Sequence, residues 1–370
     1  MNDLSERMAV FVPSMIGGGA ERIALNLAGG MSEHGYDVDL VLARAEGPYL
    51  AEVPESVRVI DLRASRTLTS LPSLVRYLRR ERPQAMLSVL GHANLIALWA
   101  RRLAGVPTRV VVSVRNTLSR SAQRSPNLRK RLMLKLVRRY YPWADGIVAV
   151  SKGVADDLSQ VAGIARDRIQ VIYNPIVTPT LQAKARASLN HPWFMNGQTP
   201  VVLSVGRLTA TNQKDYPTLI KAFAQVRLSR SARLLILGEG EQRSKLEAMV
   251  KQLGLEQDVS LPGFVANPYP YMAHASVFVL SSRWEGLPGV LIEGLYCGVP
   301  VVATDCPSGP REILKDGQYG QLVPVGDANA LARAIEVSLE GNTPSPPAES
   351  WSPYELESVV SQYVNLLLGS

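Results

Sequence analysis

The sequence predicts an α/β protein with two tandem domains, each a doubly wound parallel sheet. Three observations predict this fold. Short apolar, β-branched runs alternate with helix-length segments, the alternation restarts after a proline-rich stretch near the middle, and a length of 370 residues suits two domains. Continuous apolar strands are typical of parallel sheets that helices cover on both faces.

The expected strands fall into two sets, one in each half of the chain. Those of the first half are residues 8–12, 38–42, 86–89, 110–114 and 147–150. Those of the second half are residues 201–205, 234–237, 277–280 and 301–303. Because parallel neighbours are joined by crossover segments, usually helices, each set predicts one doubly wound sheet.

The domain boundaries follow from the proline, glycine and serine content. Residues 175–200 are rich in proline and contain no strand-like run, which marks the interdomain connection. We therefore expect an N-terminal domain of residues 1–180 and a C-terminal domain of residues 198–345. A segment rich in Pro and Ser then precedes a last helix within residues 351–370, and we expect this detached helix to pack back on the first domain.

The composition excludes several classes of protein. Hydrophobic residues make up 46% of the chain and charged residues 19%, which rules out disordered and collagen-like chains. Cys297 and Cys306 are too few for a disulfide framework, and no Cys/His cluster has zinc spacing, so we expect a reducing compartment and no structural metal. No apolar run is long enough to span a bilayer and the first residues lack signal-peptide features, which predicts a cytoplasmic protein that is free to touch a membrane.

Positive charge is concentrated in the first half of the chain. Residues 1–180 hold 25 basic and 15 acidic side chains, and residues 82–144 within them hold 13 basic and no acidic ones. Residues 115–139 can form an amphipathic helix, and aromatic residues follow it. Its basic side chains include Arg129, Lys130, Arg131, Lys135, Arg138 and Arg139. Two interpretations are open: the helix binds an anionic membrane surface, or it is solvated with its leucines facing the core.

The most distinctive motif follows the expected strand at 277–280. It reads S-S-R-W-E-G-L-P-G-V-L-I-E from Ser281 to Glu293. Helical spacing resumes at Gly289, so a helix N-terminus lies at the carboxyl end of a parallel strand, where ligands bind. Glu285 in the loop and Glu293 in the helix could accept hydrogen bonds from sugar hydroxyls. The alternative is that acidic residues near a helix start merely suit its dipole.

Two further loops follow expected strands. Arg207 and Lys214 come after residues 201–205, where a guanidinium and an ammonium could together neutralise a diphosphate; alternatively, both are solvated surface charges. After the first strand, residues 17–19 are three glycines, which let a ligand approach the backbone closely. Their spacing is not G-x-G-x-x-G, which argues against simple dinucleotide binding, and an ordinary tight turn is the alternative.

These motifs occur in order along the chain. They are the glycine loop with Glu21, I-Y-N-P at 172–175, G-R-L with Lys214, the E-G-L-P-x-x-x-x-E pair of Glu285 and Glu293, and G-V-P-V-V-A-T at 298–304. In this combination the sequence resembles the retaining, two-domain glycosyltransferases of the large GT4 family, bacterial cell-envelope members above all, over nearly the whole chain. The resemblance implies the GT-B architecture of two Rossmann-like domains.

The resemblance also implies a nucleotide-sugar donor, linked to UDP in preference to GDP and held mostly by the second domain. Arg207 and Lys214 would hold its diphosphate, Glu293 would hold the ribose hydroxyls, and Glu285 would stand next to the donor sugar. The other donor-site residues would be Gly18 and Gly19 over the phosphates, Gly263, Phe264 and Val265 beside the base, and Gly286, Leu287 and Pro288 in the loop.

The sequence departs from the pattern of the family in two places, one of which is Asn174-Pro175-Ile176, where Asn-Gly is commoner. At the other, many relatives carry a His just after the strand equivalent to residues 110–114, where it contacts the donor sugar, but this sequence has Arg115 and Asn116 there. His92, which follows the preceding strand, is the only nearby histidine. The candidate catalytic residues are therefore Glu285, His92 and Arg115.

The implied activity is transfer of a hexosyl or N-acetylhexosaminyl group with retention of configuration. The acceptor hydroxyl would attack the face from which the diphosphate departs, and a donor phosphate oxygen would help to take the proton. Because Arg207 and Lys214 would do what a metal does elsewhere, we expect no metal and no other cofactor.

The expected partner is a glycan or polyprenyl-diphosphate-linked acceptor at the inner face of the plasma membrane. We expect peripheral association with that anionic surface, and a monomer or homodimer. A nucleotide-sugar epimerase of the same two-domain fold is the nearer alternative. A nucleic-acid-binding protein is the remoter one, since motifs that read RNA or DNA are absent and we expect no nucleic acid partner.

Overall fold

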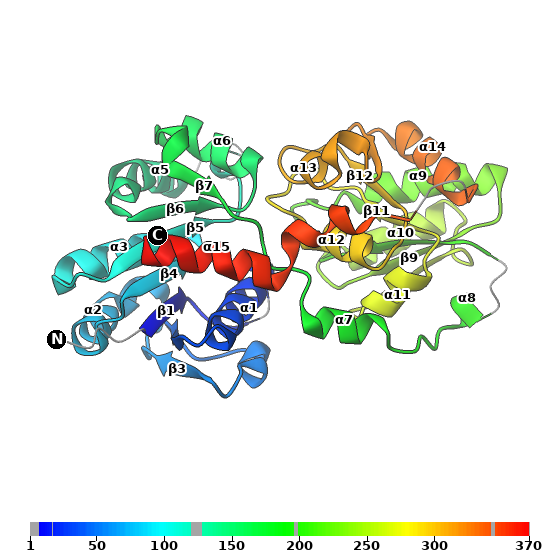
Figure 1. Ribbon diagram of the computed structural model, residues 1–370. Helices are drawn as coiled ribbons and strands as arrows, with labels where there is room; N and C mark the ends of the chain where they lie inside the picture. Colours follow the sequence, from blue (N-terminus) through cyan, green and yellow to red (C-terminus); the bar gives the residue numbers. More distant parts are fainter. Residues whose placement is uncertain (1–6, 17, 120–127, 196–198, 342–344, 370) are drawn as a thin grey trace. The chain divides into compact units, whose positions relative to one another are not determined.

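The computed structural model describes residues 7–16, 18–119, 128–195, 199–341 and 345–369, without the side chains of residues 128–131. The chain forms two compact units (Figure 1). The first comprises Met1–Pro175 together with Tyr354–Ser370, and the second comprises Ile176–Pro353. Residues 176–200, expected from the sequence to be a connection, are thus part of the second unit, where Asn267 donates a hydrogen bond to the Lys184 carbonyl at 3.0 Å.

The first unit is built on a parallel sheet with the strand order β3-β2-β1-β4-β5-β6-β7. Its strands are β1 (Arg7–Val12), β2 (Asp37–Leu42), β3 (Val57–Asp61), β4 (Ala85–Val89), β5 (Arg109–Val114), β6 (Gly146–Ala149) and β7 (Ile169–Val171). The central strand β1 pairs with both β2 and β4, so that Val10 lies between Leu40 and Leu87. Strands buried on both faces explain the continuous apolar runs.

The second unit is built on a parallel sheet with the strand order β10-β9-β8-β11-β12-β13. Its strands are β8 (Val201–Val205), β9 (Arg233–Leu237), β10 (Val259–Gly263), β11 (Val277–Leu280), β12 (Val301–Thr304) and β13 (Gln321–Val323). The predicted fold of two tandem doubly wound parallel sheets is therefore confirmed, and all nine expected strands are present.

Helices connect the strands and cover the sheets (Figure 1). In the first unit they are α1 (Gly19–Glu33), α2 (Leu71–Glu81), α3 (Gly91–Ala104), α5 (Leu128–Tyr140), α6 (Lys152–Ala162) and α15 (Leu356–Leu368). In the second unit they are α7 (Pro179–Ala185), α8 (Pro192–Met195), α9 (Tyr216–Ser229), α10 (Arg243–Gln252), α11 (Tyr269–His274), α12 (Gly289–Tyr296), α13 (Pro310–Ile313) and α14 (Ala328–Leu339). Right-handed crossovers place α1 on one face of the first sheet and α2, α3, α5 and α6 on the other.

The C-terminal helix α15 returns to the first unit, as the sequence predicted. It packs against α1, β4 and β5 and covers the part of the α1 face of the sheet that α1 itself leaves open (Figure 1). Gly30 of α1 permits the close approach, because a Cβ at this position would lie 2.6 Å from Cγ2 of Val360. Val360, Tyr363 and Leu367 of α15 are each 0% exposed.

Four strands were not predicted from the sequence: β3, β7, β10 and β13. All four are edge strands of the two sheets. Their burial is broken by exposed or half-buried positions, as in β3, where only Val57 is buried. A strand with only one paired neighbour and one covered face lacks the continuous apolar run by which the central strands were recognised.

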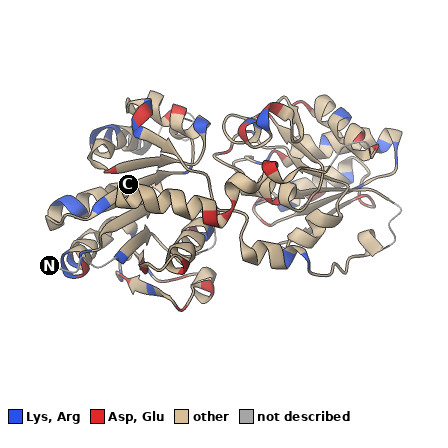
Figure 2. Cartoon of the chain, viewed as in Figure 1, with Lys and Arg blue, Asp and Glu red and all other residues tan. Residues whose placement is uncertain are grey.

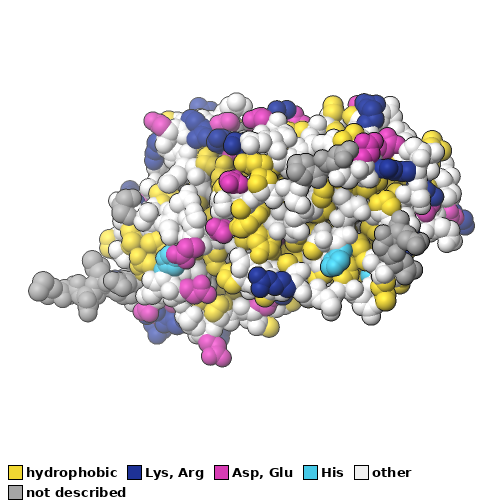
Figure 3. Space-filling view, turned by 45° about the vertical axis from the view of Figure 1, so that its right-hand side comes forward, with side chains coloured by type: hydrophobic (Ala, Val, Ile, Leu, Met, Phe, Trp, Pro, Cys, Tyr) yellow, Lys and Arg dark blue, Asp and Glu magenta, His cyan; other side chains and the backbone are white. Residues whose placement is uncertain are grey.

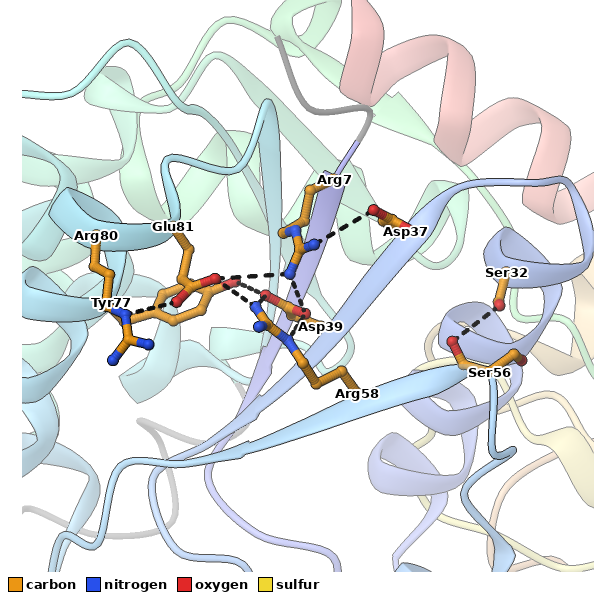
Figure 4. A network of polar contacts seen from close by, with 9 residues as sticks. All are labelled: Arg7, Ser32, Asp37, Asp39, Ser56, Arg58, Tyr77, Arg80 and Glu81. Carbon is orange, nitrogen blue, oxygen red and sulfur yellow. Dashed lines mark hydrogen bonds and ion pairs between the residues drawn. The ribbon is translucent and has the colours of Figure 1, made fainter. Parts of the chain in front are cut away.

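A buried carboxylate joins three strands and a helix at the amino edge of the first sheet (Figure 4). Asp39 of β2 is 1% exposed. Arg58 of β3 donates to both of its oxygens at 2.7 Å, and the Tyr77 hydroxyl of α2 donates to Oδ2 at 2.7 Å. Arg7 of β1 lies 3.4 Å from Oδ1, and Glu81 of α2 pairs with Arg58 at 2.6 Å. Burial and the neighbouring Asp39 charge raise the pKa of Tyr77, which keeps its hydroxyl protonated as a donor.

Candidate functional site

The carboxyl edge of the second sheet contains a topological switch point. From the central pair β8 and β11, the chain continues to β9 on one side and to β12 on the other. The loops after β8 and β11 therefore diverge and leave between them the crevice in which open α/β sheets bind ligands. Lys214 lies in the first loop and Glu285 in the second, so the structure brings together two motifs that are 71 residues apart.

An ion pair joins the two loops across this switch point. Lys214 Nζ lies 2.8 Å from Glu285 Oε1, and the Ser282 hydroxyl donates to the same oxygen at 2.6 Å. The Gln213 side-chain amide donates to Oε2 at 3.3 Å. Glu285 is only 8% exposed, so its charge is held by these donors rather than by water. Sequence reasoning had named Lys214 and Glu285 but missed Gln213 and Ser282.

A second set of contacts fixes the backbone around Lys214. Asp215 is 1% exposed with a φ of 46°, and its Oδ2 accepts from Arg283 Nε at 2.8 Å. The Ser281 hydroxyl donates to the Lys214 carbonyl at 2.6 Å, and the Arg283 amide donates to the Gln213 carbonyl at 2.8 Å. Asp215 and Arg283 were also missed, since nothing in the spacing links two residues so far apart in the chain.

Arg207 precedes Lys214 in the loop after β8, and its side chain is exposed. Within the described residues its side chain makes no hydrogen bond or ion pair, so it is available to an anion. The loops after β8 and β9 approach closely, because Gly238 has a φ of 149° and a Cβ there would lie 2.0 Å from the Gly206 carbonyl oxygen. Only glycine permits this approach.

The loop after β10 extends the same edge of the sheet. The Gly238 amide donates to the Gly263 carbonyl at 2.8 Å, which joins the loops after β9 and β10. Gly263 has a φ of 99°, and Phe264, which follows it, is 79% exposed. Val265 is half-buried. An exposed aromatic ring at the ligand edge of a sheet can stack on a nucleobase.

Helix α12 begins at Gly289, the residue at which the sequence predicted a helix N-terminus. Its N-cap, Pro288, provides no side-chain cap, so the first N–H groups can interact with a ligand. Glu293 lies in the second turn and is half-buried. The Ser308 hydroxyl donates to the Gly286 carbonyl at 2.8 Å and holds the loop before the helix, in which Leu287 is buried.

Within the ranges that the structure describes, the cysteines and acidic residues form no cluster that could hold a metal ion. Burial raises the pKa of Cys306 to about 12, and the nearby Glu285 charge adds to this, so the thiol is protonated at neutral pH. No group of three His, Cys, Asp or Glu with metal-binding geometry occurs in the described part of the chain. Asp37 and Asp39 form a D-x-D sequence, a pair of carboxylates that could be considered for a metal ion. They lie at the amino end of β2, and Asp39 accepts a hydrogen bond from Arg58 instead.

The first sheet has its own switch point, between β1 and β4. Gly18 is the N-cap of α1, which begins at Gly19 and has no side-chain cap; Gly17 lies outside the described residues. His92 is in the first turn of α3, after Leu90, which has a φ of 89°. His92 is exposed, although packing around its ring lowers its pKa and favours the neutral imidazole.

Arg115 differs from His92 in its burial and in its contacts. It follows β5, is 9% exposed, and donates from Nη1 to Asn174 Oδ1 at 2.6 Å. Burial lowers its pKa, while the Tyr363 hydroxyl and Glu21 act in the opposite direction. The two candidates for the position of the family histidine are thus an exposed imidazole and a buried guanidinium.

Comparison with known proteins identifies the family. Residues 17–178 match the model of Glycosyltransferase Family 4, and residues 199–340 match that of Glycosyl transferases group 1. The chain is 34% identical over 346 residues, 90% of each protein, to the N-acetylgalactosamine-N,N'-diacetylbacillosaminyl-diphospho-undecaprenol 4-alpha-N-acetylgalactosaminyltransferase of Campylobacter jejuni. The chain belongs to glycosyltransferase family 4. The family resemblance seen in the sequence is therefore confirmed.

Another relative of this family 4 glycosyltransferase is named for lipopolysaccharide core biosynthesis. The chain is 30% identical over 338 residues to the lipopolysaccharide core biosynthesis glycosyltransferase LpsE of Rhizobium meliloti, with 88% of this chain and 87% of LpsE covered. Among solved structures, HepE of Anabaena in complex with UDP has a TM-score of 0.79 at 21% identity, over 98% of this chain and 100% of HepE. That similarity confirms the GT-B fold.

The basic helix predicted within residues 115–139 is α5, which begins only at Leu128; residues 115–117 are not helical. Lys135, Arg138 and Arg139 are exposed on it, whereas the side chains of Arg129, Lys130 and Arg131 lie outside the described residues. Figure 2 shows Lys and Arg gathered on α2, α3 and α5. Among the described residues, no helix combines the length and the apolar character needed to cross a bilayer.

Aromatic and cationic side chains form one surface across α3 and α5. We define this basic–aromatic surface as Trp99, Arg102, Arg139, Tyr140 and Trp143. The Tyr140 ring packs edge-on against Trp99 and Trp143 at 5.3 and 4.8 Å, and both arginines lie 5.8 Å from the centre of the Trp143 ring. Apolar side chains remain visible over much of the face drawn in Figure 3, so exposed leucines alone mark no site.

The packing of α5 bears on the two interpretations of this helix. Val137 is its buried contact with the domain, at 1% exposure, whereas Leu132 is 54% exposed. At least one of the leucines expected to face the core therefore faces outward, next to the basic side chains.

Proposed function

We propose that the protein transfers a sugar, with retention of configuration, from a UDP-sugar to a hydroxyl of a lipid-linked glycan at the inner face of the plasma membrane. The observation that carries this proposal is the Lys214–Glu285 ion pair at the switch point of the second sheet, with the exposed Arg207 in the same loop as Lys214. The relative from C. jejuni is by its name a transferase acting on a diphospho-undecaprenol-linked glycan, and HepE was solved with UDP.

Each residue of the proposed donor site has a role that suits its chemistry. Arg207 and Lys214 neutralise the diphosphate and make it a less basic leaving group, which stabilises the transition state electrostatically. Glu293 accepts hydrogen bonds from the ribose hydroxyls, and Phe264 stacks on the base. Glu285, which is ion-paired with Lys214, lies beside the donor sugar while the charge of that sugar changes during transfer. No carboxylate need act as a nucleophile in this mechanism.

The proposed donor site is tested by thermal unfolding with UDP, GDP and ADP and their sugar conjugates. A ligand that binds only the folded state raises Tm, and we expect the uridine series to do so. The shift should disappear in Glu293→Ala and in Arg207→Ala. No shift with any nucleotide in folded wild-type protein would refute the donor site. Formation of a new sugar nucleotide without any acceptor would favour the epimerase alternative instead.

Removal of divalent metal should leave the activity intact. Arg207 and Lys214 supply the positive charge at the diphosphate, so transfer is expected to proceed in EDTA at the rate seen without it. The measurement is initial rate with a UDP-sugar before and after dialysis against EDTA. A complete loss that Mg²⁺ or Mn²⁺ restores would contradict metal independence.

The basic–aromatic surface is proposed to dock on anionic lipid. Interfacial aromatics beside arginines suit a negatively charged headgroup layer. Co-sedimentation with vesicles should therefore increase with phosphatidylglycerol content, decrease with salt, and fall in Arg102→Glu/Arg139→Glu. Lys221→Glu, an exposed charge reversal in the second unit, is the matched control. Binding that depends on neither anionic lipid nor salt would argue against this surface.

A further inference from the structure

Arg115 has buried donors that no part of the described chain satisfies. Its Nη1 is paired with Asn174, but Nε and Nη2 are buried without a hydrogen-bond partner. Leaving donors of a charged group unpaired and away from water costs free energy. A guanidinium that is nine-tenths buried with only one of its three nitrogens paired therefore points to a partner outside the described residues.

Other arginines of this protein show what the Nε–Nη2 edge binds. Arg58 uses it to hold both oxygens of Asp39, each at 2.7 Å. Arg243 uses it on Glu239, with Nε to Oε1 and Nη2 to Oε2 both at 2.8 Å. Two parallel N–H groups match the spacing of two oxygens on one carboxylate or phosphate. The edge left open in Arg115 is thus suited to an oxyanion.

The C-terminal helix brings a further donor to the same place. Tyr363 of α15 is 0% exposed, and its hydroxyl is buried without a hydrogen-bond partner. It is close enough to raise the pKa of Arg115 both electrostatically and as a hydrogen-bonding group. Arg115, Asn174 and Tyr363 come from three separate segments, all within the first unit. They meet at the carboxyl end of β5, the edge at which doubly wound sheets bind ligands.

We propose that Arg115 and Tyr363 form an oxyanion site in the first unit that binds a phosphoryl group of a substrate, with Asn174 positioning the guanidinium. The nature of that substrate rests on the proposed function. Two sources offer the same chemistry: the diphosphate of the nucleotide-sugar donor and the diphosphate of a lipid-linked acceptor. Arg115 and Tyr363 belong to the first unit, whereas Arg207 and Lys214 belong to the second.

Glu21 is the acidic side chain whose charge acts on Arg115 from the neighbouring helix α1. Its carboxylate is turned toward Gly18, since a Cβ on Gly18 would lie 2.4 Å from Oε2. If Arg115 served only to pair with Glu21, removing that charge would have the same effect as removing the guanidinium. Glu21→Gln therefore separates a structural ion pair from a ligand site.

The test is calorimetric binding of UDP and of farnesyl diphosphate, with farnesol as the uncharged control. Arg115→Lys keeps the positive charge but loses the two parallel N–H groups of the Nε–Nη2 edge. We expect it to weaken the affinity for one of the two diphosphates at least tenfold. Tyr363→Phe should weaken the same ligand several-fold. Arg109→Lys is the matched control, because Arg109 begins the strand that Arg115 follows and contacts the same helix through the Leu367 carbonyl at 3.1 Å. Farnesol binding should not change in any variant.

The two arms identify the source of the oxyanion. A loss confined to UDP assigns the site to the donor, and a loss confined to farnesyl diphosphate assigns it to the acceptor. Unchanged affinity for both ligands in Tyr363→Phe and Arg115→Lys overturns the inference, as does an equal loss in Glu21→Gln. If Arg115→Lys does not fold, Tyr363→Phe, which removes one oxygen, decides alone.

The outcome is separable from that of the proposed function. Binding of UDP that needs Arg207 but not Arg115, with farnesyl diphosphate equally independent of Arg115, defeats this inference and leaves the donor site standing. Binding of farnesyl diphosphate through Arg115 without any binding of UDP supports this inference and defeats the proposed donor site. Failure of the wild-type protein to bind either ligand defeats both.

Discussion

Replacing Lys214 with methionine is expected to lower kcat/KM for the sugar donor by about 10²–10³-fold, the usual effect of removing one charge-stabilising donor from a transition state. Methionine keeps much of the length of the side chain but removes the ammonium that faces Glu285 at 2.8 Å. UDP affinity should fall as well, whereas uridine affinity should not, because uridine lacks the diphosphate. Steady-state kinetics and calorimetry with both ligands measure these effects.

The controls separate binding from folding. Lys214→Met leaves the 8%-exposed Glu285 without its cation, which can destabilise the second unit by itself. The double variant Lys214→Met/Glu285→Gln removes both charges and should recover stability without recovering UDP affinity. Lys221→Met, on the exposed side of α9, should match wild type in every assay. Recovery of UDP affinity in the double variant would show that Lys214 acts only on Glu285.

Replacing Asp39 with asparagine is expected to destabilise the first unit by about 3 kcal/mol, the lower end of the range for removing one partner of a buried ion pair. Asp39 is 1% exposed and accepts from Arg58 and Tyr77 at 2.7 Å (Figure 4). The lower end applies because the Arg58 side chain is 45% exposed and water can solvate part of it.

Hydrogen–deuterium exchange in urea can assign this loss to one unit. Peptides from β2 and β3 should lose protection at lower urea concentration in Asp39→Asn, while peptides from β8 and β9 should keep theirs. Asp37→Asn is the matched control on the same strand, because the Asp37 side chain is 71% exposed and its contact with Arg7 is 3.3 Å long. Equal effects of the two substitutions would mean that the burial of Asp39 contributes nothing.

The loops of the donor site could be located from the sequence, but their partners could not. A polar loop after an apolar strand lies at the carboxyl edge of a parallel sheet, and this placed Arg207, Lys214 and Glu285. The hydrogen bonds to Glu285 from Gln213 and Ser282 depend on how two distant loops fold toward each other. No periodicity or spacing records such a contact.

The sequence by itself determined the fold class, the two sheets and every strand buried on both faces, because burial on both faces requires a continuous apolar run that is visible in the residues. It also located the helix start at Gly289 and the basic helix α5. Only the tertiary structure decided which edge strands complete the sheets, that Lys214 pairs with Glu285, and that α15 brings Tyr363 to Arg115. These features depend on side chains that are far apart in the chain and become neighbours only after packing, so their residue types alone do not reveal them.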